Sequence, residues 1–364
     1  MKEEQRKVLI LYTGGTIGMR SKPGGGGLAP ESMEDLQKNI PQIEGLPYDI
    51  EWQECKYEGK FIDSSFAGPK MWNVLGEKIM KNYDKCDGMV VVFGTDTMGP
   101  SATALSYHLE GLKKPVIFTG SMKPAVDEDS DGPKNMVDAI RLAGESGRSI
   151  PSIEGVSICF FGKLTNPADT FKISAQALDA MGLFKDKNPL ATINDDEIIV
   201  GNIQEKNNLQ SEARYLPKTD KRVAELNVGF RKMFRDEESL VVRAEGVDGI
   251  LLYNLQEDTM YPEKLQAFYD GIEKQYSNKV IFFMGDNLPN KRWVKLKCST
   301  NNHEHINAVL KAEYILQRTS NLEEIKKLAE SNLRGESEGP IVNETEILKW
   351  MEANREVQGA KDRR

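Results

Sequence analysis

Two short glycine-containing runs hold the residues of this sequence best suited to attack a carbonyl carbon. Residues 13–18 read Thr-Gly-Gly-Thr-Ile-Gly, and residues 94–97 read Gly-Thr-Asp-Thr. Glycine lets backbone N–H groups approach a ligand closely, and such groups stabilise the oxyanion that forms when a hydroxyl attacks. Thr16 is therefore a candidate nucleophile. Thr95 supplies a second hydroxyl, and Asp96 supplies a carboxylate that grips a substrate ammonium group or holds a proton-transfer partner.

Both runs also have structural interpretations. The first is a glycine turn whose threonine finds a local partner. The second is a good helix N-cap, because Asp and Thr side chains accept hydrogen bonds from the first backbone N–H groups of a helix. The first run lacks the Gly-x-Gly-x-x-Gly spacing of dinucleotide-binding turns, so a dinucleotide site is the weaker interpretation.

Further polar residues can complete such a site. A hydroxyl is a weak nucleophile at its own pKa and needs a base. Lys172 is a candidate if burial and neighbouring charges lower its pKa, although a lysine taken alone is usually a surface residue. Asp63, Ser64 and Ser65 precede a helix that the sequence predicts from Pro69. Two adjacent serines hydrogen-bond a carboxylate or simply cap that helix.

The elements that must position these residues follow from hydrophobic patterning. Residues 8–12 and 89–93 are apolar runs without polar alternation, which is typical of strands buried on both faces. Strands alternating with helices indicate a mostly parallel sheet flanked by helices. Ligands bind past the carboxyl ends of such strands, so neighbouring strands bring both glycine runs to one crevice. Further strands are predicted at residues 115–119 and 155–161, and helices at 30–40, 69–83, 101–112 and 135–143.

Length and polarity indicate two domains. At 364 residues the chain is long for a single core. We expect a larger N-terminal α/β domain at residues 1–205, a polar linker at 206–222, a smaller C-terminal α/β domain at 223–336 and a C-terminal extension at 337–364. The smaller domain has predicted strands at 249–254 and 279–284 and predicted helices at 262–275 and 304–330. The extension has a predicted helix at 344–355.

Composition excludes several classes of protein. The net charge of −8 argues against nucleic acid as the main partner. No apolar stretch approaches the roughly 20 residues that a membrane helix needs, and the charged N-terminus indicates no secretory signal. Four cysteines without a zinc-like spacing favour a reducing cytoplasm and no disulfides. His303 and His305 lack a third spaced ligand and His108 falls within a helix, so we expect no metal and no other cofactor.

Four motifs together resemble the bacterial-type L-asparaginases, most closely the cytoplasmic type I enzymes. Residues 12–19 (Tyr-Thr-Gly-Gly-Thr-Ile-Gly-Met) resemble the first signature of that family, and residues 94–98 resemble its second. Residues 332–336 are similar to the closing motif of type I members. A third conserved block is matched by residues 119–124, Ser130, Asp131, Gly132 and Asn135.

The resemblance implies a two-domain asparaginase-like α/β fold, with a larger N-terminal mostly parallel sheet and a smaller C-terminal α/β domain. It implies hydrolysis of the side-chain amide of asparagine to aspartate and ammonia, without a cofactor. By position, Thr16 resembles the primary nucleophile. Thr95, Asp96 and Lys172 resemble a second triad, in which Lys172 tunes Thr95.

The resemblance also implies how the substrate is held. Residues 63–65 match the loop that holds the α-carboxylate, and Asp96 meets the α-ammonium. The family places residues of one subunit at the site of its neighbour, which implies a homodimer or homotetramer. The implied substrate-binding residues are Gly15, Asp63, Ser64, Ser65 and Gly94.

The sequence departs from the family at several places. A tyrosine that helps activate the threonine is missing from residues 21–28, which hold four glycines instead. Phe93 stands where histidine is usual, and Phe66 follows the paired serines where aspartate is usual. The region from 284 to 299 is also shorter than in the family. We therefore expect either an amidohydrolase of reduced activity or altered substrate, or a degenerate asparaginase fold that binds an amino acid or a partner protein.

Overall fold

The computed structural model describes residues 5–22, 27–184, 187–194, 197–201, 203, 213–218, 221–227, 247–253, 262–284, 291–298 and 306–333. The chain divides into two compact units, Met1–Pro217 and Lys218–Arg364. Among the described residues, none of the helices has both the length and the apolar character needed to cross a bilayer.

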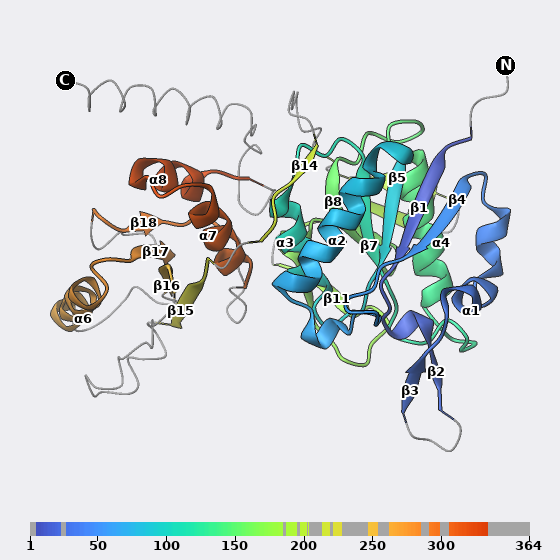
Figure 1. Ribbon diagram of the computed structural model, residues 1–364, viewed down its shortest axis with the longest axis horizontal. Coiled ribbons are helices and arrows are strands. Elements are labelled where there is room, and N and C mark those ends of the chain that lie inside the picture. The colour runs from blue at the N-terminus through green and yellow to red at the C-terminus, as the bar shows by residue number, and fades with distance from the viewer. Residues whose placement is uncertain are drawn as a thin grey trace. The chain divides into compact units, whose positions relative to one another are not determined.

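An eight-stranded sheet forms the centre of the first unit (Figure 1). Its order is β13-β12-β9-β8-β7-β5-β1-β4. The neighbours from β4 to β8 are parallel, whereas β9, β12 and β13 continue the sheet in antiparallel pairing. The strands are β1 (Lys7–Tyr12), β4 (Asp49–Glu54), β5 (Gly88–Val92), β7 (Pro115–Thr119), β8 (Gly155–Phe160), β9 (Lys163–Thr165), β12 (Ala191–Asn194) and β13 (Glu197–Val200).

Helices cover both faces of this sheet (Figure 1). Helices α2 (Pro69–Asn82) and α3 (Met98–His108) lie on one face, and α1 (Met33–Lys38) and α4 (Gly132–Glu145) lie on the other. Because alternate strand residues point to opposite faces, every second residue of β1 joins a buried cluster with α1 and α4. Both faces of the central strands are therefore buried, which explains their unbroken apolar runs.

The strand neighbours expected from the sequence are confirmed. Strands β1 and β5 are adjacent and parallel, with Tyr12 opposite Val92, so their carboxyl ends meet at one edge of the sheet. The structure adds short hairpins that the sequence did not indicate. They pair β2 (Met19–Ser21) with β3 (Leu28–Pro30), and β10 (Thr170–Lys172) with β11 (Met181–Leu183).

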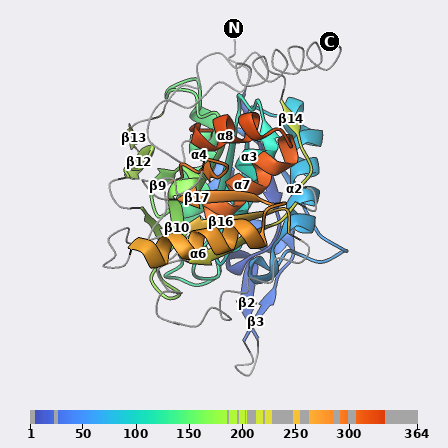
Figure 2. The same ribbon diagram turned by 90° about the vertical axis from the view of Figure 1, so that its left-hand side faces the viewer.

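The second unit has a parallel sheet of its own, with the order β15-β16-β17-β18. Figure 2 shows its strands β16 and β17. The rings of Tyr269, Phe283 and Trp293 pack in its core with centroids 5.4 to 5.9 Å apart. The elements are β15 (Val223–Asn227), β16 (Gly249–Tyr253), α6 (Pro262–Gln275), β17 (Val280–Met284), β18 (Val294–Lys295), α7 (Ile306–Arg318) and α8 (Leu322–Glu330).

Several segments differ from the prediction. The single helix expected over 304–330 is two helices, because Asn321 caps a new start by accepting from the N–H groups of Glu323 and Glu324. The helix expected over 101–112 ends at His108, and β6 (Leu109–Glu110) follows it. Within the expected linker, β14 (Arg214–Tyr215) pairs with β6 in the first unit.

Other predictions fall outside the described residues. These are the extension at 337–364 with its helix at 344–355, most of the linker at 206–222, residues 334–336 of the closing motif, three of the four loop glycines at 24–26, and the pair His303 and His305.

Candidate functional site

The chain leaves β1 through glycines that hold it against the end of β5. The N–H and the Oγ1 of Thr13 both donate to Val92 O, at 3.1 and 2.7 Å. Gly15 has a φ of 95°, which residues with side chains rarely adopt, and a Cβ there would lie 2.8 Å from Gly94 N. Only glycine therefore allows the two runs to touch. Thr16 follows directly, half-buried, and opens the short 3-10 helix η1 (Thr16–Gly18).

The loop after β4 brings the paired serines to the same place. Ser64–Phe66 forms the 3-10 turn η3, and its N-cap Asp63 accepts from Ser65 N–H at 2.9 Å. The Oγ of Ser64 occupies the space that a Cβ on Gly94 would need. Glycine at position 94 thus makes room for both the Ser64 hydroxyl and the backbone of the first run.

Lys172 reaches this group from a distant part of the chain. It is the last residue of β10, and its Nζ donates to Thr95 Oγ1 at 2.9 Å and to Asp96 Oδ1 at 2.7 Å. The other carboxylate oxygen of Asp96 accepts from Ser65 Oγ at 2.7 Å. Direct hydrogen bonds therefore link a hydroxyl, an amine, a carboxylate and a second hydroxyl in one row.

The hydrogen bonds in this row determine the ionisation state of Asp96. The Lys172 ammonium and the Ser65 hydroxyl hold the pKa of Asp96 below its ordinary value. Asp96 is therefore an ionised carboxylate near neutral pH, and it acts as an acceptor only. Its side chain is 52% exposed, while that of Lys172 is 20% exposed and Thr95 is buried. An incoming ligand therefore contacts the exposed Asp96 carboxylate before it reaches the buried Thr95 hydroxyl.

The loop after β7 lies beside η1 and is held by buried polar groups. Asn135 of α4 donates to Gly120 O at 2.9 Å and to Asp131 Oδ2 at 3.0 Å. Ala125 N–H donates to Ile17 O at 2.9 Å, which joins this loop to the turn that carries the candidate nucleophile. Burial raises the pKa of Asp131 even though three N–H donors reach its carboxylate. The third conserved block of the sequence therefore helps to hold η1, which carries Thr16, in position.

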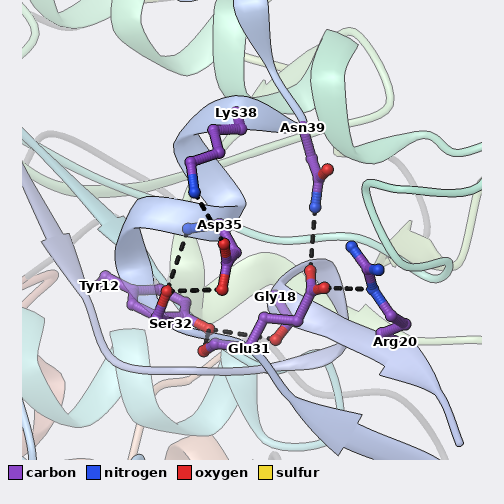
Figure 3. Close-up of polar contacts among 8 residues, drawn as sticks. All are labelled: Tyr12, Gly18, Arg20, Glu31, Ser32, Asp35, Lys38 and Asn39. Atoms are coloured by element: carbon purple, nitrogen blue, oxygen red, sulfur yellow. Dashed lines mark hydrogen bonds and ion pairs between the residues drawn. The ribbon is translucent and has the colours of Figure 1, made fainter.

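Glu31 fastens the base of the β2–β3 hairpin that follows η1 (Figure 3). Its N–H donates to Gly18 O at 2.8 Å, and its carboxylate accepts from Arg20 Nε at 2.5 Å and from Asn39 Nδ2 at 2.9 Å. The Tyr12 hydroxyl lies 3.3 Å from Gly18 O and 3.4 Å from Glu31 O. Glu31 was not predicted as a site residue, because nothing in its local sequence indicates these partners.

The structure brings the predicted site residues to one edge of the sheet. Lys172 contacts Thr95 and Asp96 directly, Ser64 and Ser65 reach Gly94 and Asp96, and Thr16 joins them through the Gly15–Gly94 contact. Within the described part of the chain, no three His, Cys, Asp or Glu side chains are grouped as a metal site.

The fold and this site define an amidohydrolase-like protein with threonines at parallel strand ends. A family model described as "Asparaginase, N-terminal" matches residues 7–205. The chain belongs to the asparaginase family.

Several named proteins are similar to this chain. L-asparaginase 1 of Escherichia coli K12 is 35% identical over 179 residues, which is 49% of this chain and 50% of that protein. The chain thus matches about half the length of that relative. L-asparaginase of Thermococcus kodakarensis is 26% identical over 355 residues, covering 92% of this chain and 99% of that protein. The mouse 60 kDa lysophospholipase is 33% identical over 219 residues, 54% of this chain and 37% of that protein.

Solved structures share the fold. The thermostable L-asparaginase from Thermococcus kodakarensis has a TM-score of 0.73 at 24% identity, covering 92% of this chain and 99% of that one. L-asparaginase I from Vibrio cholerae has a TM-score of 0.71 at 24% identity, covering 92% and 100%. The two-domain asparaginase fold expected from the sequence is confirmed.

Proposed function

We propose that this chain hydrolyses the side-chain amide of L-asparagine to L-aspartate and ammonia. The observation that carries the proposal is the contact of Lys172 Nζ with both Thr95 Oγ1 and Asp96 Oδ1, at 2.9 and 2.7 Å, beside the Gly15–Gly94 crossing. A hydroxyl, an amine and a carboxylate in direct contact are the groups that proton transfer and amino-acid binding need. Family membership and the relatives named L-asparaginase support the same reaction.

In the first half of the proposed reaction, the Thr16 hydroxyl oxygen bonds to the amide carbon and gives its proton to a base. The carbonyl oxygen gains a negative charge, which backbone N–H groups of the glycine run stabilise. The C–N bond then breaks, the nitrogen takes up a proton, and ammonia leaves. The product of this half is an ester between Thr16 and the aspartyl group.

In the second half, water attacks the ester carbon and releases L-aspartate, and the departing oxygen recovers its proton as the Thr16 hydroxyl. Lys172 holds the Thr95 hydroxyl in place to take part in the proton transfers. Asp96 binds the α-ammonium group of the substrate. Ser64 and Ser65 contact the remaining polar groups of the amino-acid head.

The first proton needs an acceptor other than a loop tyrosine. Tyr12 is a poor substitute, because burial raises its pKa above the ordinary value and its hydroxyl lies against Gly18 O and Glu31 O. A water molecule or another hydroxyl takes this role in the proposal. We therefore expect a slower reaction, or a different preferred amide, than in relatives that keep the tyrosine.

A degenerate asparaginase fold that binds an amino acid or a partner protein is the second candidate. It is favoured by the loop at residues 21–28, which holds four glycines and no tyrosine. Under this interpretation the Asp96 and Ser64 groups bind a ligand without turnover.

Ammonia release from L-asparagine by the purified protein decides between the two. We expect wild type to release ammonia and Thr16→Ala to lower kcat by at least about 10³-fold, because the nucleophile is lost. Thr192→Ala is the matched control, and we expect it to keep full activity. Thr192 lies on β12, towards the end of the strand order opposite to β4. If wild type releases no ammonia while L-asparagine raises its melting temperature, the binding module is the correct function. A panel with L-glutamine and larger amides tests the substrate.

The family resemblance also supports a proposal for the oligomeric state and the cellular location of the protein. We propose a homodimer or homotetramer in the cytoplasm. Sedimentation of the purified chain at micromolar concentration tests this, and a monomer alone would contradict it.

A further inference from the structure

The first turn of α3 touches the strand that carries Lys172. A Cβ on Gly99, the second residue of α3, would lie 2.6 Å from Thr170 O in the backbone of β10. Ordinary van der Waals contact begins at 3.4 Å, so a side chain here would require the backbone to move by about 0.8 Å. Gly99 is buried inside a helix, where alanine is otherwise the more favourable residue. The close contact with β10 is therefore the physical reason for a glycine at this position.

Two contacts tie β10 to the short segment that follows β5. Lys172 Nζ donates to Thr95 Oγ1 at 2.9 Å and to Asp96 Oδ1 at 2.7 Å. Two residues earlier in the strand, the backbone of Thr170 lies against Gly99. Because Nζ bonds to both acceptors at once, its position relative to this segment is narrowly defined. The close approach that Gly99 permits therefore sets how far the Lys172 side chain must reach to its partners.

The opposite side of the α3 turn is fixed by hydrogen bonds. Trp72 Nε1 of α2 donates to the buried Ser101 Oγ at 2.9 Å. Thr97, the N-cap residue of α3, donates from Oγ1 to Ser64 O at 2.6 Å, and its own carbonyl oxygen accepts from Ser101 N–H at 2.9 Å. These bonds hold the turn to α2 and η3. The turn can retreat from β10 only by breaking them.

Strand β10 is the weaker side of this contact. It has three residues and pairs with β11 in a two-stranded sheet. Its Thr170 hydroxyl lies 2.7 Å from Asn166 O and 2.8 Å from Thr165 Oγ1. The ring of Phe171 stacks on that of Phe184 with the centroids 5.0 Å apart. A methyl group added to α3 at the contact would therefore displace β10 rather than α3, and the lysine of β10 would move with it.

We propose that Gly99 is a positioning residue for the proposed reaction. By letting β10 lie against α3, it keeps Lys172 within hydrogen-bond distance of Thr95 and Asp96. This inference rests on the proposed function, because Lys172 acts there by holding the Thr95 hydroxyl in place. A small displacement is enough to disturb that role, since hydrogen bonds weaken beyond about 3.2 Å and misplacing a catalytic group by about 1 Å costs up to about 10²-fold in rate.

Gly99→Ala tests the proposal. We expect the rate of ammonia release from L-asparagine to fall about 10- to 10²-fold, mainly through kcat, because the displaced lysine no longer holds Thr95 in place. The acid limb of the pH profile of kcat/KM should also move to higher pH, because Asp96 loses the ammonium group that holds its pKa down. A loss of folded protein alone would lower the rate by the same factor at every pH and leave the acid limb in place.

Gly76→Ala is the matched control, because it also adds a methyl group to a buried glycine of a helix. A Cβ there would meet the ring of Tyr215, so the strain falls on β14 rather than on β10. This variant should lower the free energy of unfolding and leave kcat and the acid limb unchanged. Thr170→Val removes the hydroxyl that anchors β10 and adds no clash. It should move the acid limb in the same direction as Gly99→Ala, and Thr170→Ser should restore the wild-type profile.

A folded Gly99→Ala with wild-type kcat would overturn the proposal, and so would a lowered kcat with an unmoved acid limb. If Gly99→Ala does not fold, a Thr170→Val profile that coincides with that of wild type overturns it instead. A wild type that releases no ammonia refutes the proposed function only. The pKa of the Asp96 carboxyl, measured by NMR titration of isotope-labelled protein, then decides the inference without turnover. It should be raised in Gly99→Ala and Thr170→Val but not in Gly76→Ala, and values equal to that of wild type in the first two would overturn the proposal.

Discussion

At the residue scale, Lys172 donates to two acceptors of different kinds. Its contact with Asp96 is an ion pair of 2.7 Å, and its contact with Thr95 is a 2.9 Å hydrogen bond in which the threonine oxygen accepts. The hydrogen of the Thr95 hydroxyl therefore points away from Lys172, where a water molecule or substrate can accept it. Lys172 thus orients Thr95 and keeps Asp96 ionised at the same time.

Lys172→Met tests both effects. We expect kcat to fall about 10²- to 10⁴-fold, because Thr95 loses the amine that orients it. The acid limb of the pH profile of kcat/KM should also move to higher pH, because Asp96 loses the largest influence that lowers its pKa. The measurement is steady-state ammonia release from L-asparagine across the acid range.

The control is Lys7→Met, which removes a similar ion pair, 2.6 Å to Glu51, at the opposite end of β1. It should leave both kcat and the acid limb unchanged. A Lys172→Met profile with an unmoved acid limb would contradict the role of Asp96. The same ion pair contributes to stability. Because the pKa of Asp96 is lowered in the folded protein, its ionised carboxylate favours the folded state at neutral pH, and this contribution is lost as the pH falls.

The sequence indicated Thr16, Thr95 and Asp96 because their motifs are local and follow apolar strands. Lys172 was assigned through the family resemblance, since its partner Asp96 lies 76 residues away in the chain. The Ser65–Asp96 bond joins residues 31 apart, and no sequence pattern shows which of a serine's hydrogens is already in use. Polar pairs between residues this far apart in the chain can be identified only from the three-dimensional structure.

At the element scale, predictability follows the apolar pattern. Strands β1 and β5 were predicted because they are buried and apolar along their whole length. The edge strand β4, with the sequence Asp-Ile-Glu-Trp-Gln-Glu, pairs on one side only and was missed. The three-residue strands β10 and β11 were missed as well, because such short strands are fixed by packing and pairing rather than by their own pattern.

The junction of β1 with η1 gives a test at this scale. Gly15→Ala puts a Cβ 2.8 Å from Gly94 N at a φ of 95°. We expect a cost of about 1–3 kcal/mol in the free energy of unfolding from backbone strain, with further loss from the clash. Because the clash separates the two glycine runs, kcat should fall by more than the folded fraction does. Chemical denaturation and ammonia release measure the two effects.

Gly45→Ala is the matched control, because a Cβ there meets nothing within 4 Å and the φ is ordinary. It should change neither the free energy of unfolding by more than about 0.5 kcal/mol nor the activity. Full activity in Gly15→Ala would show that the Gly15–Gly94 contact is not needed for catalysis.

At the scale of the whole molecule, each unit has its own hydrophobic core. The first core lies between the large sheet and helices α1 and α4, and the second surrounds Tyr269, Phe283 and Trp293. The residues of the candidate site all belong to the unit Met1–Pro217. Two cores of this kind favour unfolding in two steps rather than one.

Calorimetric melting with and without L-aspartate tests this organisation. At 100 times its Kd, a ligand stabilises the unit that binds it by about 2.7 kcal/mol, which corresponds to about 5–10 °C for a unit of this size. We expect one of two transitions to shift by this amount and the other to stay in place. Ile281→Val, in the core of the second unit, should lower only the unshifted transition, by about 2–4 °C. If L-aspartate moves both transitions together, the second unit contributes to the site or unfolds with the first.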